Sequence, residues 1–365
     1  MKHVYLIFLF LQFLSISFFC NSEVDIFLNS LENRVGKDLF KTFSIISGIK
    51  NENITQNTDK RNLNIFNPNN ERKTLMKTLS KDCLSFSEKI CLALFLDNPS
   101  SDFLEIKKRQ NILKALRSFQ DFYEMKNILL SFLKNENNFL ETILYPQRYE
   151  TLSNEDICEK LFAIQCFLKM IKKMYKIIIR NDDISIYINE YIKNISKIVK
   201  NEDFSDSFTK TLKFFYKKKI KNRRLGFCRN QKIEYLKNVY DHRYDFFLAL
   251  YDFSRIFMFW NIATSNLEYA FAKIYDVKEK NTPFLKVEKM CNIYNKKQIN
   301  DTFTLNLNKS GTFVVMKLNN VFHNNITTKV LLLNVYLSQV FGISFAKNFE
   351  LTIFNRIDTQ ISKII

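Results

Sequence analysis

Glycine and proline are so scarce in this chain that they limit the folds it can adopt. Only 5 Gly and 4 Pro occur among 365 residues. Tight turns and phosphate-binding loops often need glycine, because a residue without a Cβ atom takes backbone angles that other residues avoid. The composition therefore argues against an all-β sandwich and a dinucleotide-binding α/β sheet, and it favours long helices. With 46% hydrophobic residues, the chain can bury a substantial core.

The first 22 residues have the three-part pattern of a secretory signal peptide. A basic start precedes an apolar run from Val4 to Phe19, and small or polar residues follow as far as Ser22. The run of about 16 apolar residues is short for a bilayer span, which needs about 20. We therefore expect cleavage before Glu23, no transmembrane span in the mature chain, and a secreted or secretory-organelle location, such as an apical organelle, a vacuole or the cell surface.

The cysteine pattern predicts a disulfide framework, since an even number of cysteines in a secreted chain favours bridges. Two pairs share a spacing of eight residues, and both lie in helical patterns. Eight helical residues rise about 12 Å, which is too far for a bridge within one helix. Antiparallel packing of the two helices would join Cys83 to Cys166 and Cys91 to Cys158. The six cysteines of the mature chain are Cys83, Cys91, Cys158, Cys166, Cys228 and Cys291.

This scheme leaves Cys228 to pair with Cys291, and its alternative is a set of buried free thiols with coincident spacing. Metal binding is not expected, because the sequence has no C-x-x-C pair and the mature chain offers only His242 and His323 as imidazole ligands. No other cofactor is expected.

Periodicity and composition divide the chain into five segments. Apolar residues recur at helical intervals through most of residues 74–280. Beyond them, Thr302–Asn308 alternates like a strand and is followed by a turn at Gly311 and a second β-like run, which predicts a hairpin. The predicted fold is mainly α, a multi-helix array with disulfides and a small β-containing C-terminal unit. The segments are a signal peptide (1–22), an N-terminal helical segment (23–50), an Asn-rich linker (51–73), a helical domain (74–280) and a C-terminal region with the hairpin (281–365).

Local signals place several helix ends. Asp102 is a candidate N-cap, and Ser153 with Asp156 forms a capping-box pattern. Residues 74–96 are predicted as one helix that carries the first cysteine pair, whereas residues 330–341 fit either a buried strand or a helix. One aromatic face in the later helices resembles a ligand groove but is more typical of core packing: Phe246, Leu250, Phe253, Phe257 and Trp260.

The residues needed for common catalytic sites do not form a recognisable pattern. The phosphate-binding, dinucleotide-binding, zinc-protease and serine-hydrolase motifs are all absent from the sequence. We expect His242 at the start of a helix and His323 in an Asn-rich loop. We expect Asp182 and Asp183 to be loop residues without a catalytic role. We therefore expect a protein that is not an enzyme.

The densest charge cluster lies at residues 213–224, in a chain of net charge +18. Such clusters bind nucleic acid, but a secreted protein meets sulfated glycans, anionic lipids and acidic proteins instead. The alternative is a solvated helix end, where cations complement the helix dipole. A second basic stripe, at Lys169, Lys172, Lys173 and Lys176, is expected on the polar face of its helix. The residues predicted to bind an anionic surface are Lys213, Lys217, Lys218, Lys219, Lys221, Arg223 and Arg224.

The composition resembles that of secretory proteins from AT-rich apicomplexan parasites of the malaria type. Forty Asn and abundant Lys, Ile and Phe accompany the scarce Gly, Pro and Trp over the whole chain. The export signal R-x-L-x-[EQD] of that group is matched at Arg61 and Leu63 but not at Ile65, so export into the host cytosol is not predicted. The resemblance implies a place in the parasite secretory system.

These observations predict a secreted, non-enzymatic binding protein. Its partner would be another protein or an anionic host surface, with host-cell entry or vacuole biology as the setting and no nucleic acid as ligand. The alternative is a membrane-perturbing or pore-forming secreted protein, because amphipathic helices with Phe-rich faces and basic flanks suit membrane adsorption.

Overall fold

The computed structural model describes residues 28, 34–49, 60, 63–66, 74–145, 151–200, 229–265, 267–276, 284–291, 298–306 and 321–354, and these are mainly helical, as predicted. The helices are α3 (Arg34–Ser47), α5 (Leu75–Leu79), the 3-10 helix η1 (Ser80–Asp82), α6 (Phe86–Asp97), α7 (Phe103–Arg117), α8 (Phe122–Leu133), α9 (Glu136–Leu144), α10 (Asn154–Ile179), α11 (Asp182–Ile188), α12 (Lys193–Lys200), α14 (Arg229–Asp241), α15 (Arg243–Ala263) and α17 (Val321–Phe341). The strands are β1 (Ala270–Phe271), β2 (Lys273–Tyr275), β3 (Phe284–Cys291), β4 (Gln298–Asn306), β5 (Ile343–Ser344) and β6 (Ala346–Thr352).

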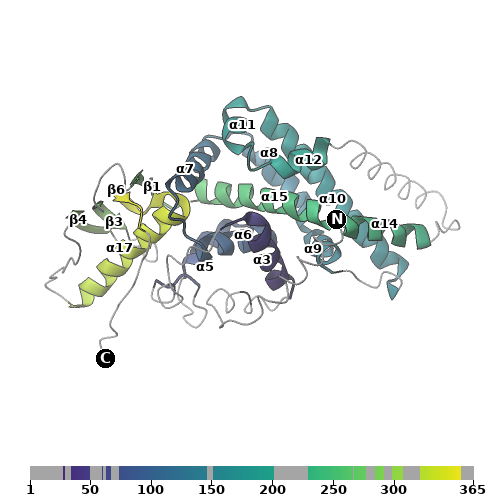
Figure 1. Ribbon diagram of the computed structural model, residues 1–365, viewed down its shortest axis with the longest axis horizontal. Coiled ribbons are helices and arrows are strands. Elements are labelled where there is room, and N and C mark those ends of the chain that lie inside the picture. Colours follow the sequence, from purple (N-terminus) through teal and green to yellow (C-terminus); the bar gives the residue numbers. More distant parts are fainter. Residues whose placement is uncertain are drawn as a thin grey trace, which may run out of the picture.

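Helix α15 is the central element of the helical part. It contacts α6, α7, α12 and α3, and Figure 1 shows α8, α11 and α12 on one side of it and α3, α5 and α6 on the other. A helix that is apolar around its whole circumference must be buried on all sides. The described part of the chain has this one helix long and apolar enough to cross a membrane, and 83% of its most apolar window is buried inside the protein.

A cluster of phenylalanine rings joins α15 to α8, α9 and α10. Phe139 stacks on Phe167 with ring centroids 4.2 Å apart, and Phe132 lies 5.6 Å from both. Phe246 on α15 approaches Phe139 edge-on at 6.1 Å. These separations are typical of favourable aromatic pairs. The aromatic face predicted to be core is therefore confirmed as core, although its last member, Trp260, is only partly buried.

Capping side chains decide where the helices begin. The predicted capping box of α10 is present, and Asp102 caps α7 by accepting the Leu104 N–H at 2.8 Å. The single helix predicted for residues 74–96 is wrong. A second capping box, between Ser85 and Glu88, starts α6 afresh after α5 and η1. Cys83 consequently lies before α6 and not within it.

The C-terminal β unit is a four-stranded sheet of order β2-β6-β3-β4 beside a two-stranded pair, β1-β5. The β2-β6 pair is parallel and the remaining pairs are antiparallel. Because β1 and β2 precede residue 281, the unit begins earlier than predicted. Strand β4 pairs with β3, and the second arm of the predicted hairpin, residues 312–318, lies outside the described residues. The predicted strand near Phe349 is confirmed as β6, and residues 330–341 belong to the helix α17.

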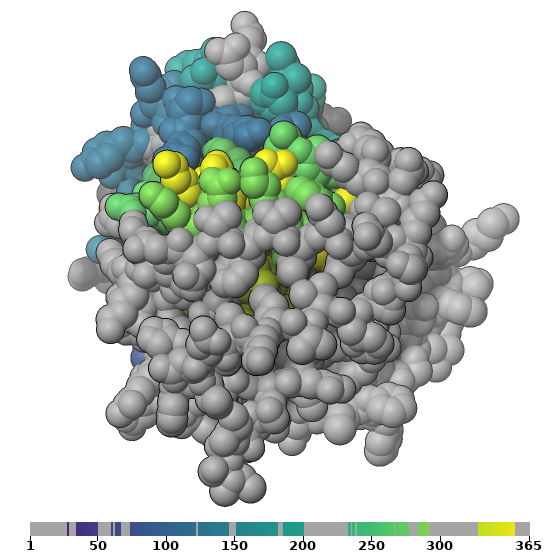
Figure 2. Space-filling view, turned by 90° about the vertical axis from the view of Figure 1, so that its left-hand side faces the viewer, coloured from purple at the N-terminus to yellow at the C-terminus, as the bar shows by residue number. Residues whose placement is uncertain are grey.

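The β unit, at one end of the molecule, contacts the helical part through α7. Figure 2 views the molecule from this end and shows the yellow C-terminal residues against the blue helical residues. The Gln110 amide donates to the carbonyl oxygens of Ala272 and Gly342, both at 2.7 Å. Gly342 has φ +73°, and a Cβ atom there would come within 2.9 Å of the Gln110 Cβ. Glycine is therefore required at this close approach.

Part of the predicted Asn-rich linker is packed against the helical core. Leu63, Ile65 and Phe66 are buried, and the Lys60 ammonium lies 2.6 Å from the Asp97 carboxylate at the end of α6. The apolar residues within this polar stretch are enough to hold its middle on the protein surface. Within the predicted Asn-rich linker, residues 51–73, these described positions are therefore part of the packed structure.

Candidate functional site

Several sequence-predicted features lie outside the described residues. They include the signal peptide at 1–22, Cys228 and the whole basic cluster at 213–224. Those predictions therefore remain predictions. Two smaller interpretations are corrected by the backbone: His323 is in helix α17 and not in a loop, and Asp182 and Asp183 open helix α11. His242 immediately precedes α15, as expected for a helix start.

The described cysteines form no disulfide with one another. Helix α6, which follows Cys83 and contains Cys91, packs against α15 and α3, whereas α10, which contains Cys158 and Cys166, packs against α8, α9 and α12. The antiparallel ladder that would join Cys83 to Cys166 and Cys91 to Cys158 is not formed, because its two helices have different neighbours. Burial raises the pKa of the Cys83 and Cys91 thiols far above their ordinary value. Cys291 is at the end of strand β3.

Two rows of exposed lysines occupy neighbouring helices. The predicted stripe on α10 is exposed at Lys169, Lys173 and Lys176 and half-buried at Lys172. Helix α12 repeats the same spacing, and its exposed lysines are Lys193, Lys197 and Lys200. The two helices are joined by a hydrogen bond of 3.2 Å between the Tyr175 and Ser196 hydroxyls. We name these six exposed side chains the lysine face. Its α12 row was not predicted, although the lysines are spaced by four and three residues, a helical periodicity that the sequence shows.

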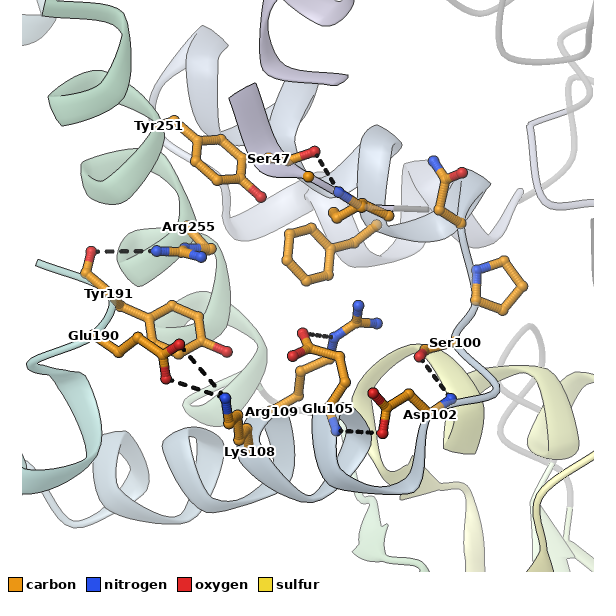
Figure 3. A pocket seen from close by; sticks show the side chains of 15 residues that line it. Ser47, Ser100, Asp102, Glu105, Lys108, Arg109, Glu190, Tyr191, Tyr251 and Arg255 are labelled. Carbon is orange, nitrogen blue, oxygen red and sulfur yellow. Dashed lines mark hydrogen bonds and ion pairs between the residues drawn. The ribbon is translucent and has the colours of Figure 1, made fainter. Parts of the chain in front are cut away.

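A cavity of about 320 Å³ lies against α15, beside the turn that precedes α12. Its walls are the end of α3, the residues that follow α6, the first turns of α7, the turn between α11 and α12, and the middle of α15. Figure 3 shows that charged and aromatic side chains from these elements converge on it. Its volume falls at the lower end of the range for small-molecule sites.

Arg255 enters this cavity from α15 with its guanidinium sandwiched by aromatic rings. Its central carbon lies 3.9 Å from the Tyr191 ring centroid and 4.9 Å from that of Tyr251. Its Nη2 atom is 3.1 Å from the Asp252 carboxylate and donates to the Tyr191 carbonyl oxygen at 3.4 Å. The Nε atom is buried and has no hydrogen-bond partner among the described residues.

Arg109 supplies a second guanidinium from α7. Only 2% of its side chain is exposed, Nη1 donates to the Val340 carbonyl oxygen at 2.8 Å, and Nε lies 3.0 Å from the Glu105 carboxylate. The guanidinium also sits over the Phe95 ring at 4.7 Å. Because a bonded neighbour holds each side of the group, its position in the cavity wall is fixed.

Burial shapes the ionisation of the groups around Arg255. Desolvation raises the pKa of Asp252 to about 6, and the neighbouring Arg255 charge and the Asn194 hydrogen bonds oppose that shift. Desolvation likewise raises the pKa of Tyr191 to about 12. At neutral pH Arg255 is therefore a cation, Asp252 is its counter-ion, and both tyrosines keep their hydroxyl protons.

Two buried acids, Glu88 and Glu136, lie at the N-terminus of α6. Glu136 accepts the backbone N–H groups of Phe86 and Ser87, both at 3.0 Å, and the Ser87 hydroxyl at 2.7 Å. Each carboxylate oxygen is thus engaged by the start of the helix. Burial raises the pKa of Glu136, and these hydrogen bonds and the helix N-terminus oppose that rise. Glu136 therefore has a structural role in capping. No cluster of three metal-binding side chains occurs among the described residues.

No protein-family model matches this sequence, and no curated protein has significant sequence similarity to it.

Proposed function

We propose that the protein is a secreted, non-enzymatic binding protein that recognises an anionic surface, such as a sulfated glycan or an anionic membrane. The lysine face is the observation that carries this proposal. Helix α12 contains no acidic residue, and α10 contains none after Glu159. Several cations without acids beside them on the same helices create a positive field that attracts anionic partners.

Among the described residues one acid pairs with the lysine face, and three acids, Glu202, Asp203 and Asp206, follow α12 in the sequence. Lys197 forms one ion pair, at 3.0 Å from Asp245, and that pair is exposed to solvent. Exposed pairs of this kind contribute little energy and are exchanged easily for a stronger anionic partner. The predicted basic cluster at 213–224 follows α12 in the sequence. It adds seven cationic residues to the same part of the chain.

The test is loss of binding when one lysine row is removed. Each lysine close to an anionic surface contributes about 1 kcal/mol, so a triple substitution should weaken binding by roughly two orders of magnitude. The test variant replaces the α10 row, Lys169→Ser, Lys173→Ser and Lys176→Ser. The control removes the same charge from exposed positions on α3, α5 and η1, across α15 from the lysine face (Figure 1): Lys41→Ser, Lys77→Ser and Lys81→Ser.

Binding is measured at physiological salt on a heparin column and by co-sedimentation with phosphatidylserine vesicles. Loss of binding in the α10 variant, with retention in the control, supports the proposal, and the probe affected identifies glycan or membrane. Equal weakening in both variants would show that net charge alone acts and would overturn it. Release of vesicle dye at low protein concentration would instead favour the membrane-perturbing alternative. Binding to neither probe would also overturn the proposal and point to a protein partner.

A further inference from the structure

The wall of the cavity beside α15 encloses a buried hydrogen-bond donor that lacks an acceptor. Arg255 Nε is without a partner among the described residues, although Nη2 of the same guanidinium is engaged by Asp252 and by the Tyr191 backbone. Buried N–H groups are nearly always paired, and an unpaired one calls for an explanation. A ligand oxygen in the cavity would satisfy it.

The chemistry of the donor selects an oxyanion as its partner. A guanidinium N–H forms its strongest hydrogen bonds with carboxylate or phosphate oxygens. The two tyrosine rings that hold Arg255 fix its orientation, so little conformational entropy is lost when an anion binds. The Phe95, Tyr191 and Tyr251 rings also line the cavity and offer an apolar surface to the rest of a ligand.

The other charges in the wall limit the total charge of that ligand. The cavity is lined by the cations Lys108, Arg109 and Arg255 and by an equal number of acids: Asp102, Glu105 and Glu190. A doubly charged anion such as phosphate would leave this balance strongly negative. A ligand that carries one carboxylate and one ammonium group leaves it unchanged, and each end finds an opposite charge.

We propose that this cavity binds a small zwitterion of the α-amino-acid class. Its carboxylate accepts the Arg255 Nε–H. Its ammonium group lies beside Glu190, which pairs with Lys108 at 3.2 Å, and Glu105, which pairs with Arg109 at 3.0 Å, and it shares these carboxylates with the two cations. Figure 3 shows these acids and Arg255 around one opening. A volume of about 320 Å³ admits an apolar side chain of the size of leucine, which the aromatic rings would contact. This site goes beyond the proposed function, since it lies apart from the lysine face.

A series of matched ligands tests the two charged ends separately. The probes are L-leucine, 4-methylpentanoate, which lacks the amine, 3-methylbutylamine, which lacks the carboxylate, and inorganic phosphate. Isothermal titration calorimetry should give the tightest binding for leucine, weaker binding for 4-methylpentanoate, and none for 3-methylbutylamine or phosphate. Binding of phosphate in preference to leucine would overturn the assignment. So would the absence of binding by all four probes at millimolar concentration.

Matched substitutions on α15 test the role of the Arg255 donor. Arg255→Lys keeps the charge but removes Nε–H, and it should weaken leucine binding by roughly 10- to 100-fold, the loss of one charge-assisted hydrogen bond. Arg243→Lys is the control, because Arg243 on the same helix also lies over a tyrosine ring, at 4.0 Å from that of Tyr240, yet does not line the cavity. Equal weakening by both substitutions would overturn the proposal.

Two further measurements keep the test decisive if Arg255→Lys fails to fold. In wild-type protein that contains isotope-labelled arginine, the NMR signal of the Arg255 Nε–H should shift when leucine is added and stay unchanged with 3-methylbutylamine. Glu190→Gln, at an exposed rim position, should weaken leucine binding but not that of 4-methylpentanoate. An Arg255 signal that does not respond to leucine would refute the site. The lysine-face variants should bind leucine normally, so the proposed function and this site can fail independently.

Discussion

Glu88 provides a direct test of how burial acts on a charge in this protein. Its carboxylate is fully buried at the start of α6, where it accepts the Ser85 N–H at 3.3 Å and the Asn261 amide at 2.6 Å. Burial raises its pKa from the ordinary 4.5 to about 8, and the nearby Glu136 carboxylate acts in the same direction, while the hydrogen bonds oppose the shift. The folded protein therefore binds this proton more tightly than the unfolded chain does.

The sign of the pH dependence follows from this difference. A group whose pKa is raised on folding stabilises the folded state below its unfolded pKa and loses that contribution as pH rises through the folded value. For Glu88 the window extends from pH 4.5 to about pH 8. At 1.36 kcal/mol for each pH unit, the difference amounts to about 5 kcal/mol. The free energy of unfolding should therefore fall across this window.

Glu88→Gln removes the titration while it keeps the shape of the neutral acid. Relative to wild type, the variant should gain about 5 kcal/mol in the free energy of unfolding between pH 4.5 and pH 8, measured by urea unfolding followed by circular dichroism. Glu288→Gln is a control of opposite sign, because hydrogen bonds from Asn348 and Lys286 lower the pKa of Glu288. It should lose stability relative to wild type as pH rises toward 4.5, and the difference should then stay constant across the Glu88 window. A constant difference between Glu88→Gln and wild type across the window would refute the reasoning.

Two further predictions concern the backbone and the thiols. Gly342→Ala should lower the free energy of unfolding by about 1–2 kcal/mol for the left-handed backbone and by roughly 1–3 kcal/mol more for the Cβ contact with Gln110. Gly48→Ala should show only the first loss, because φ is +63° there and no atom lies within 4 Å of the added Cβ; equal losses in urea unfolding would contradict the close packing at Gly342. Peptide mapping without reductant should recover Cys83 and Cys91 as free thiols, because both are buried. Cys83 precedes helix α6 and Cys91 lies within it, and this helix packs against α15 and α3. A peptide that links either cysteine to α10 would show that the predicted disulfide ladder forms after all.

Local signals carried most of what could be predicted about the fold. The capping box at Ser153 lies within four residues of sequence, so its pattern alone located the start of α10. The same chemistry at Ser85 was overlooked because apolar residues continue on both sides of it. Pairing between distant strands, such as the parallel contact of β2 with β6, depends on how the helices bring the chain back, and no local pattern contains that information.

The cavity was not predictable for a related reason, although one of its residues carried a visible signal. Its main contacts join Arg255 to Tyr191 and Arg109 to Val340, positions that are far apart in the sequence. Nothing in the spacing of tyrosines or arginines indicates that they meet. Asp252 and Arg255, however, are an acid and a base three residues apart within α15, the one described helix that is long and apolar enough to cross a membrane. Charges are retained in such a helix only when they are paired or used. That pattern identifies Arg255 from the sequence alone. The lack of an acceptor at its Nε atom, from which we infer the binding site, is visible only in the structure.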